Sequence, residues 1–268
     1  MLISDRPYIV MGLLDRNSLA WSIGESIQRH GGRVIYTIQN RVVKKRYLDR
    51  DLPSDESAGL DFRFCDVSKP DEITAVFSEP GGVAGVVHSL AYADPKSCLG
   101  EDFRSDAAEA ILRSYDVSCA SLARVAEQAV PAMAGGGSIV AMTFESRRAF
   151  PYYNWMGVHK AGLEALVRAL ARRHGRDDVR VNAVSAGPVS TTGAGHIPGF
   201  DALKEQWRHE APLAWDPDRD REAVADTVVF LLSGMARRIT GQTVYVDGGA
   251  SAMGGALQNF EREPASEE

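Results

Sequence analysis

Short apolar runs alternate with longer amphipathic stretches along almost the whole chain. The apolar runs are rich in β-branched side chains and carry few charges, which is typical of strands that are buried on both faces of a sheet. Seven such runs predict strands at residues 8–12, 33–37, 61–65, 83–88, 138–142, 179–184 and 243–246.

The stretches between these runs place apolar residues three and four positions apart, which predicts amphipathic helices. The predicted helices cover residues 18–28, 71–77, 105–130, 153–174, 202–210 and 221–232. One of them has a chemical start signal, because Ser68-Lys69-Pro70-Asp71 resembles a capping box with Pro70 in the first turn. Strands that alternate with helices predict an α/β fold, a doubly wound parallel sheet of the Rossmann type with about seven strands and helices on both faces.

Composition supports a single globular domain. The chain has 268 residues, of which 44% are hydrophobic and 25% are charged, and we expect one domain over residues 1–260 with a polar tail at 261–268. Its 30 Lys and Arg against 36 Asp and Glu give a net charge of −6. Because the basic residues are scattered along the chain, nucleic acid is not an expected partner.

The sequence gives no sign of a disulfide-rich, zinc-binding, membrane-spanning or secreted protein. The three cysteines, Cys65, Cys98 and Cys119, are an odd number without CxxC spacing, so neither a disulfide framework nor a metal site is predicted. No apolar run reaches the roughly 18 residues of a membrane span, and the first ten residues lack the pattern of a signal peptide. A cytoplasmic protein that does not bind membranes is the simplest expectation.

The end of the first strand is the first candidate binding segment. In doubly wound sheets, ligands collect at the carboxyl ends of the strands, where the N-termini of helices present unpaired N–H groups to anions. Gly12 allows a close backbone approach there, and Ser18 is placed to cap the next helix and also to reach a pyrophosphate. The segment lacks the G-x-G-x-x-G pattern, so an ordinary strand-to-helix turn explains it equally well.

Tyr153 and Lys160 form the strongest candidate pair. At ~100° per residue, seven positions bring both side chains to the same helix face, about 10 Å apart along the axis. A phenol close to an ammonium group can stabilise an oxyanion that develops on a substrate. The alternative at this point is a buried tyrosine and an unrelated surface lysine.

Several separated motifs together resemble the divergent branch of short-chain dehydrogenases/reductases that contains the enoyl-acyl-carrier-protein reductases (NADH), and most closely the members that serve mycolate-type acids. The resemblance runs from about residue 6 to about residue 255. Its motifs are Gly12 with Ser18-Leu19-Ala20, Asp66-Val67, His88-Ser89-Leu90-Ala91-Tyr92, Ala186-Gly187-Pro188-Val189-Ser190-Thr191, and the closing segment Thr240 to Gly249.

Within that family, the spacing Tyr-x6-Lys separates enoyl reductases from carbonyl reductases, which use Tyr-x3-Lys and an upstream serine. Here the positions four after Tyr152 and Tyr153 are Met156 and Gly157, and residues 139–142 contain no serine. A second aromatic residue is expected beside the substrate, and the resemblance assigns this place to Phe144, for which plain core packing is the alternative.

The resemblance implies hydride transfer from C4 of a reduced nicotinamide to C3 of a trans-2-enoyl thioester in fatty acid synthesis. Tyr153 would hydrogen-bond the thioester carbonyl, Lys160 would hold the nicotinamide ribose, and Phe144 would shape the site. For Ser18 and Thr191, helix capping competes with contact to the pyrophosphate. The cofactor contacts it implies are Gly12, Ser18, Leu19, Gln39, Asp66, Val67, Ser89, Leu90, Ala91, Met142, Lys160, Gly187, Pro188, Val189 and Thr191.

Cofactor choice and partners follow from the same resemblance. Gln39 and Asn40 resemble the members that use NADH, while Arg41, Lys44 and Lys45 keep NADPH as an alternative. The expected partners are an enoyl thioester carried by acyl carrier protein or coenzyme A, and further copies of the chain in a homotetramer built through helices 105–130 and 153–174. Residues 192–199 are expected to cover the acyl chain.

Two rival functions stay open. The first is a related reductase or dehydrogenase that acts on an intermediate of secondary metabolism with the same cofactor and tyrosine. The second is a cofactor-binding regulatory protein without turnover, in which Tyr153 and Lys160 would be idle.

Overall fold

Seven parallel strands form one sheet in the order β3-β2-β1-β4-β5-β6-β7. The structure is a computed structural model that describes residues 4–53, 59–78, 81–103 and 106–255. This sheet, with helices around it, confirms the predicted doubly wound fold. The strands are β1 Tyr8–Met11, β2 Val34–Ile38, β3 Phe62–Phe64, β4 Gly85–His88, β5 Gly137–Thr143, β6 Val179–Ala186 and β7 Thr243–Val246.

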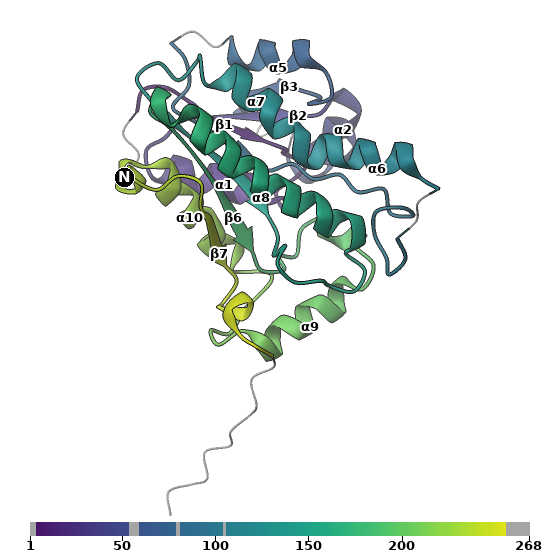
Figure 1. The fold of residues 1–268 in the computed structure, drawn as a ribbon. Helices are drawn as coiled ribbons and strands as arrows, with labels where there is room; N and C mark the ends of the chain where they lie inside the picture. Colours follow the sequence, from purple (N-terminus) through teal and green to yellow (C-terminus); the bar gives the residue numbers. More distant parts are fainter. Residues whose placement is uncertain (1–3, 54–58, 79–80, 104–105, 256–268) are drawn as a thin grey trace, which may run out of the picture.

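Helices connect the strands and cover both faces of the sheet (Figure 1). The α-helices are α1 Leu19–Arg29, α2 Arg41–Arg46, α3 Leu48–Asp51, α5 Pro70–Phe77, α6 Ala108–Tyr115, α7 Ser121–Ala129, α8 Asn154–His174, α9 Phe200–Glu210 and α10 Arg221–Leu232. A π-helix, η1 Asp116–Ala120, lies between α6 and α7, and short 3₁₀ turns are η2 Gly175–Asp177, η3 Ala194–His196, η4 Gly234–Ala236 and η5 Ala250–Ala252.

The alternation of side chains along each strand divides the core into two layers. On β1, Ile9 and Met11 pack with apolar residues of α5, α7 and α8, whereas Tyr8 and Val10 belong to the layer under α1 and α10. In Figure 1, α9 lies apart from these helices, at the end of the molecule toward which β6 and β7 run. That arrangement leaves the carboxyl edge of the sheet as the place where loops from several strands meet.

The predicted helix at residues 105–130 is interrupted by the π-helix Asp116–Ala120. The described helical residues begin at Ala108, and residue 105 lies outside the described part. The predicted polar tail also lies outside it, so the domain boundaries at 260 and 261 stay predictions. Helices α2 and α3 were not predicted as separate elements, because a six-residue and a four-residue helix show too few periodic positions.

The predicted capping box before α5 is wrong. Lys69 occupies the N-cap of α5 without a side-chain hydrogen bond, and the Ser68 hydroxyl donates instead to Asp66 Oδ1 at 2.7 Å. The Asp66 carboxylate therefore holds the hydroxyl that the pattern assigned to the helix. Pro70 does stand in the first turn, as predicted.

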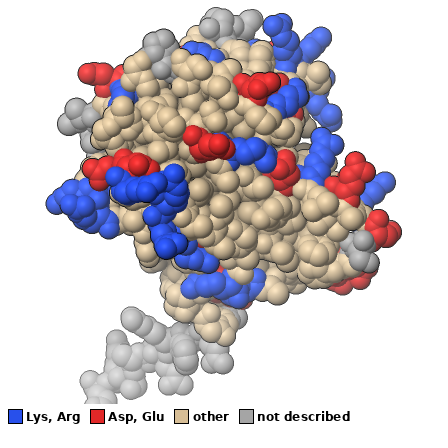
Figure 2. Space-filling model, turned by 45° about the horizontal axis from the view of Figure 1, so that its top comes forward, with Lys and Arg blue, Asp and Glu red and all other residues tan. Residues whose placement is uncertain are grey.

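Charged side chains are mixed over the face shown in Figure 2, where Lys and Arg lie beside Asp and Glu with broad uncharged areas between them. Lys69 with Glu72 and Arg124 with Asp116 are examples of paired charges. Exposed pairs of this kind each contribute little to folding stability. The two apolar layers on the sheet therefore carry most of it.

Three observations concern the described residues alone. Their cysteines, Cys65, Cys98 and Cys119, are buried and free. None of the helices within the described ranges has the length and apolar character that crossing a membrane requires. No cluster of three or more His, Cys, Asp or Glu side chains in this part of the chain is arranged to hold a metal ion.

Candidate active site

The loops after β1 and β4 meet at the carboxyl edge of the sheet. These two strands are neighbours, and β1 also pairs with β2 on its other side. Gly12 has a φ of +94°, and a Cβ there would lie 2.2 Å from the backbone oxygen of Ser89. Packing between the two loops therefore already requires a glycine at this predicted cofactor residue.

Ser18 caps helix α1, as one of the two predicted roles requires. Its Oγ accepts a hydrogen bond from the Trp21 amide at 3.4 Å and its hydroxyl donates to the Asp15 carbonyl at 2.7 Å. The first turn of α1 holds no acidic side chain. The positive end of an eleven-residue helix thus points to the loop after β1, an arrangement that suits an anion such as a diphosphate.

Gln39 and Asp66 lie together after the neighbouring strands β2 and β3. The Gln39 amide donates to Asp66 Oδ2 at 3.2 Å, and Ser68 donates to the other carboxylate oxygen. Burial opposes ionisation, but these hydrogen bonds hold the pKa of Asp66 below its usual value. Next to it, the Val67 carbonyl accepts two hydrogen bonds from Arg124. The two predicted cofactor contacts Asp66 and Val67 are therefore held in fixed positions.

Tyr153 stands at the N-cap of α8, outside its first turn. The φ of Tyr153 is −124°, so the helix begins one residue later than predicted, but its carbonyl still accepts a helical hydrogen bond from the Gly157 amide. That Tyr153 and Lys160 share one helix face stays a prediction. The residue before it, Tyr152, has a φ of +64°, an unfavourable conformation for a residue with a side chain. Its carbonyl accepts a hydrogen bond from the Gly100 amide, which helps to hold this turn.

The Tyr153 ring packs against Phe144, with ring centroids 5.2 Å apart in an edge-to-face arrangement. Phe144 also contacts Phe150 and Trp207, so the second predicted aromatic residue lies directly beside the predicted catalytic one. Burial raises the pKa of Tyr153 above its ordinary value. Its hydroxyl consequently stays protonated, and able to donate, over the whole neutral range.

Lys160 is buried, and its ammonium donates a hydrogen bond to the Met142 carbonyl at 2.9 Å. Desolvation lowers the pKa of Lys160 to about 8, although Cys119 and Glu164 oppose this shift. Met142 and Phe144 lie two residues apart at the end of β5. Lys160 and Tyr153 therefore both reach the carboxyl end of β5.

Two buried histidines, His88 and His159, lie near Lys160 but bond to serine side chains and carry no charge at physiological pH. His159 packs on the Tyr115 ring, and its Nδ1 lies 3.2 Å from Ser114 Oγ, so it points to α6. His88 Nε2 lies 2.7 Å from Ser121 Oγ. Burial first and the Lys160 charge second lower the pKa of His159 to about 4 and that of His88 to about 3. Both rings are therefore neutral at physiological pH.

A stripe of buried serines on the α6–η1–α7 helix holds the loop after β4. Ser118 Oγ accepts from the Tyr92 amide and donates to the Tyr92 carbonyl, both at 2.8 Å, and Ser114 donates to the same carbonyl at 2.6 Å. This loop contains the predicted cofactor residues Ser89, Leu90 and Ala91. The stripe was not predicted, although serines three and four positions apart are visible in the sequence.

The segment after β6 carries four predicted cofactor residues, Gly187, Pro188, Val189 and Thr191. A Cβ at Gly187 would lie 2.7 Å from the Trp215 ring and 3.0 Å from Trp207 Nε1. The Trp215 indole donates to the Pro188 carbonyl, and Thr191 Oγ1 accepts from the Ala194 amide. Thr191 thus contacts the first residue of the 3₁₀ turn η3, whose N-cap is Gly193, and both of its predicted roles stay predictions.

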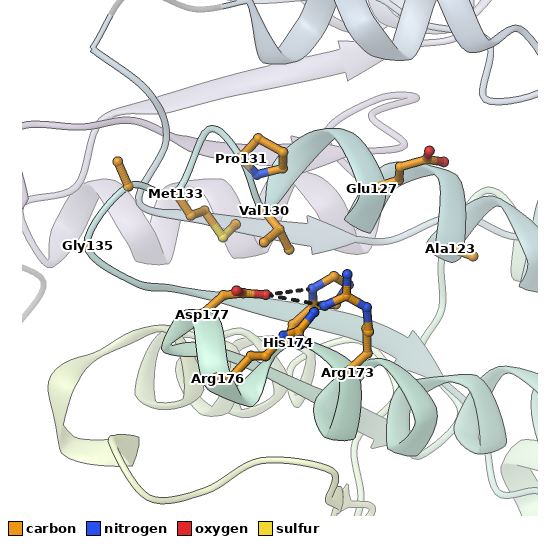
Figure 3. Close-up of a pocket in the computed structure, with 11 residues that line it drawn as sticks. Ala123, Glu127, Val130, Pro131, Met133, Gly135, Arg173, His174, Arg176 and Asp177 are labelled. Atoms are coloured by element: carbon orange, nitrogen blue, oxygen red, sulfur yellow. Dashed lines mark hydrogen bonds and ion pairs between the residues drawn. The ribbon is translucent and has the colours of Figure 1, made fainter.

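A separate hollow lies at the other end of α8 (Figure 3). It is lined by residues of α7, the α7–β5 turn and the end of α8, and Asp177 there contacts His174 and Arg173. His174 lies fourteen residues after Lys160, about 21 Å along the helix axis. This hollow therefore does not belong to the Tyr153 site. Basic side chains at a helix C-terminus are explained by the helix dipole.

The fold and these residues define the class: a doubly wound α/β protein with a donor phenol and a buried, fixed ammonium at the carboxyl end of β5. A sequence model of the family described as "Enoyl-(Acyl carrier protein) reductase" matches residues 12–251. The chain belongs to this family.

Individual relatives agree with this assignment. The Bacillus cereus enoyl-[acyl-carrier-protein] reductase [NADH] FabI is 35% identical over 260 residues, 94% of this chain and 99% of the relative. The Staphylococcus aureus reductase [NADPH] FabI is 32% identical and covers 94% and 98% of the two chains. A crystal structure of the Anaplasma phagocytophilum enzyme in complex with NAD matches with a TM-score of 0.84 and 32% identity, covering 96% of this chain and 98% of that one.

The predicted family is thus confirmed, and with it an oxidoreductase that acts on a CH–CH bond. The closer resemblance to mycolate-type members stays a prediction. The roles of the individual residues also stay predictions; the structure gives the positions and contacts of these residues.

Proposed function

We propose that the protein is an enoyl thioester reductase that uses NADH and works in fatty acid synthesis. The observation that carries this proposal is the meeting of Tyr153, Phe144 and Lys160 at the carboxyl end of β5. A phenol that stays protonated, beside an apolar wall, suits a carbonyl oxygen on which negative charge develops. The names of the relatives support the same substrate.

The residues of this chain would share the work as follows. Tyr153 donates its hydroxyl to the thioester oxygen and stabilises the charge that forms there. Lys160, held by the Met142 carbonyl, orients the cofactor ribose and keeps the local potential positive. Phe144 excludes water on the substrate side. When bound, a reduced nicotinamide would supply the hydride for C3 of the enoyl group, and the enolate that results would take up a proton at C2.

The end of β2 favours NADH over NADPH. The Asn40 side chain caps α2 by accepting from the Val42 and Val43 amides, so it is already engaged. The Arg41 guanidinium lies over the Phe64 ring at 5.7 Å. A 2′-phosphate would have to draw Arg41 from this stacked position. Relatives with either cofactor are known by name, so NADPH remains the alternative.

We further propose a homotetramer and an acyl carrier protein as the donor of the substrate. Large apolar side chains are exposed on α6 and α8, where Leu112, Tyr115 and Val158 have relative exposures of 66%, 41% and 48%. Such side chains on two packed helices suit contact with a second copy. The cytoplasmic location and the exclusion of nucleic acid stay predictions.

The test is NADH oxidation followed at 340 nm with trans-2-octenoyl and trans-2-dodecenoyl thioesters. Each acyl group is offered on acyl carrier protein and on coenzyme A, and small cyclic ketones and enones serve as the comparison. The proposal predicts consumption with the thioesters at a kcat/KM at least about 100-fold above that of the ketones. Turnover of the ketones or enones alone would favour the secondary-metabolism reductase, and no turnover with any compound would favour a regulatory protein.

A further inference from the structure

Asp15 is a buried carboxylate in the loop between β1 and α1, with a relative exposure of 7%. Its Oδ2 accepts a hydrogen bond from the Thr192 hydroxyl at 2.5 Å. Its Oδ1 is buried and has no hydrogen-bond partner among the described residues. Burying a carboxylate this incompletely satisfied costs folding free energy, so its position calls for an explanation beyond packing.

The hydrogen bond joins two loops that leave distant strands. Asp15 follows β1 and Thr192 follows β6, and strands β4 and β5 lie between them in the sheet. With strands about 4.8 Å apart, the segment from Gly187 to Thr192 must span about 14 Å along the carboxyl edge to reach Asp15. This segment, which we call the arch, therefore links the end of β6 to the loop after β1.

The two ends of this arch are attached differently. At its root, the Gly187 amide bonds to the Val246 carbonyl and the Ser190 amide to the Pro217 carbonyl, so backbone contacts fix it. At its far end, the side chain of Thr192 makes the bond to the β1 loop. Residues 193–199 follow directly and lead into α9, and they include the exposed Gly193 and Gly195.

We propose that Asp15 and Thr192 form a latch that sets the distance between the two loops that grip the cofactor diphosphate. This inference rests on the proposed function, because Ser18 and Thr191, the predicted diphosphate contacts, lie three residues and one residue from the latch partners. Both are positioning residues. By holding the arch, the latch also fixes the start of the segment that covers the substrate, so the order of that segment depends on the cofactor loop.

The test compares Thr192→Val, which removes the hydroxyl but keeps the shape, with Thr192→Ser, which keeps the hydroxyl. Thr227→Val is the matched control, since the Thr227 hydroxyl bonds to the Ala223 carbonyl within α10. Amide hydrogen exchange of residues 187–200 and the Kd for NADH are measured on the full-length protein. We expect Thr192→Val to exchange about tenfold faster in this segment and to bind NADH about tenfold more weakly, since a hydrogen bond to a charged group is lost.

The matched variants decide between a latch and a general loss of stability. Thr192→Ser and Asp15→Asn, which keep a donor and an acceptor, should restore wild-type exchange, and Thr227→Val should leave the segment unchanged. With saturating NADH, Thr192→Val should recover most of its kcat, because KM and not the chemistry is affected. Wild-type exchange and Kd in Thr192→Val would overturn the latch. Neither readout needs an enoyl substrate, so failure of the latch and failure of the proposed reaction are seen separately.

Discussion

The surroundings of Lys160 alter its acid–base chemistry. Its ammonium is buried and bonded to the Met142 carbonyl, and desolvation lowers its pKa to about 8. A charge near the cofactor ribose is useful only while the lysine is protonated. The neighbouring His88 and His159 are already neutral at about pH 5 and above, because their pKa values are about 3 and about 4. Of Lys160, His88 and His159, only Lys160 therefore changes its charge between pH 6 and 9.

This predicts a pH dependence with a defined sign. As pH rises through about 8, Lys160 loses its proton, so kcat/KM for NADH, which reports the free enzyme, should fall with a midpoint near 8. Folding stability should move in the opposite direction, because a lysine whose pKa is lowered on folding destabilises the folded state below about 8, and this penalty disappears toward the unfolded value of 10.5. A kcat/KM that is flat from pH 7 to 9.5 would contradict this assignment.

At the scale of elements, the loop after β4 depends on the serine stripe of the neighbouring helix. Ser114, Ser118 and Ser121 are fully buried; Ser114 and Ser118 bond to the Tyr92 backbone, and Ser121 pairs with Nε2 of the His88 ring. The π-helix lies in the middle of this stripe, and such turns often mark functional positions. The helix was predicted from apolar spacing, but that spacing does not distinguish a π turn from an α turn.

Replacing Ser118 should expose this dependence. In Ser118→Ala, the Tyr92 amide loses a part-buried hydrogen bond, so the free energy of unfolding should fall by about 1 kcal/mol. The KM for NADH should rise, since Ser89 to Ala91 lie on the loosened loop. Ser78→Ala is the control, because the exposed Ser78 hydroxyl bonds within its own helix end, and its change should stay within about 0.5 kcal/mol. Urea denaturation measures the free energy of unfolding of both variants. Equal losses in Ser118→Ala and Ser78→Ala would contradict the proposed dependence of the loop on the serine stripe.

For the molecule as a whole, the sequence predicts the features that depend on neighbouring residues along the chain, such as the positions of the strands. The seven strands were found because each is a short buried run, and their boundaries differ from the structure by at most two residues. Pro70 was placed correctly since its geometry suits a first turn, but Ser68 was not, because a nearby carboxylate competes for its hydroxyl.

Long-range pairings lie beyond such a pattern. Asp15 and Thr192 are 177 residues apart and meet only because the order of strands brings two loops to one edge. Tyr153 and Lys160 likewise reach the end of β5 through contacts with Phe144 and Met142, which belong to another element of the fold. Candidate residue types can thus be named from the sequence, whereas their contacts depend on the completed sheet.

The central claim is that the Tyr153 hydroxyl stabilises the charge that forms on an enoyl thioester. Tyr153→Phe keeps the ring beside Phe144 and removes only the donor. With trans-2-dodecenoyl thioester and saturating NADH, kcat should fall about 100- to 1,000-fold, while the Kd for NADH stays within about twofold of the wild type. A variant whose kcat remains within about twofold of the wild type would contradict the account.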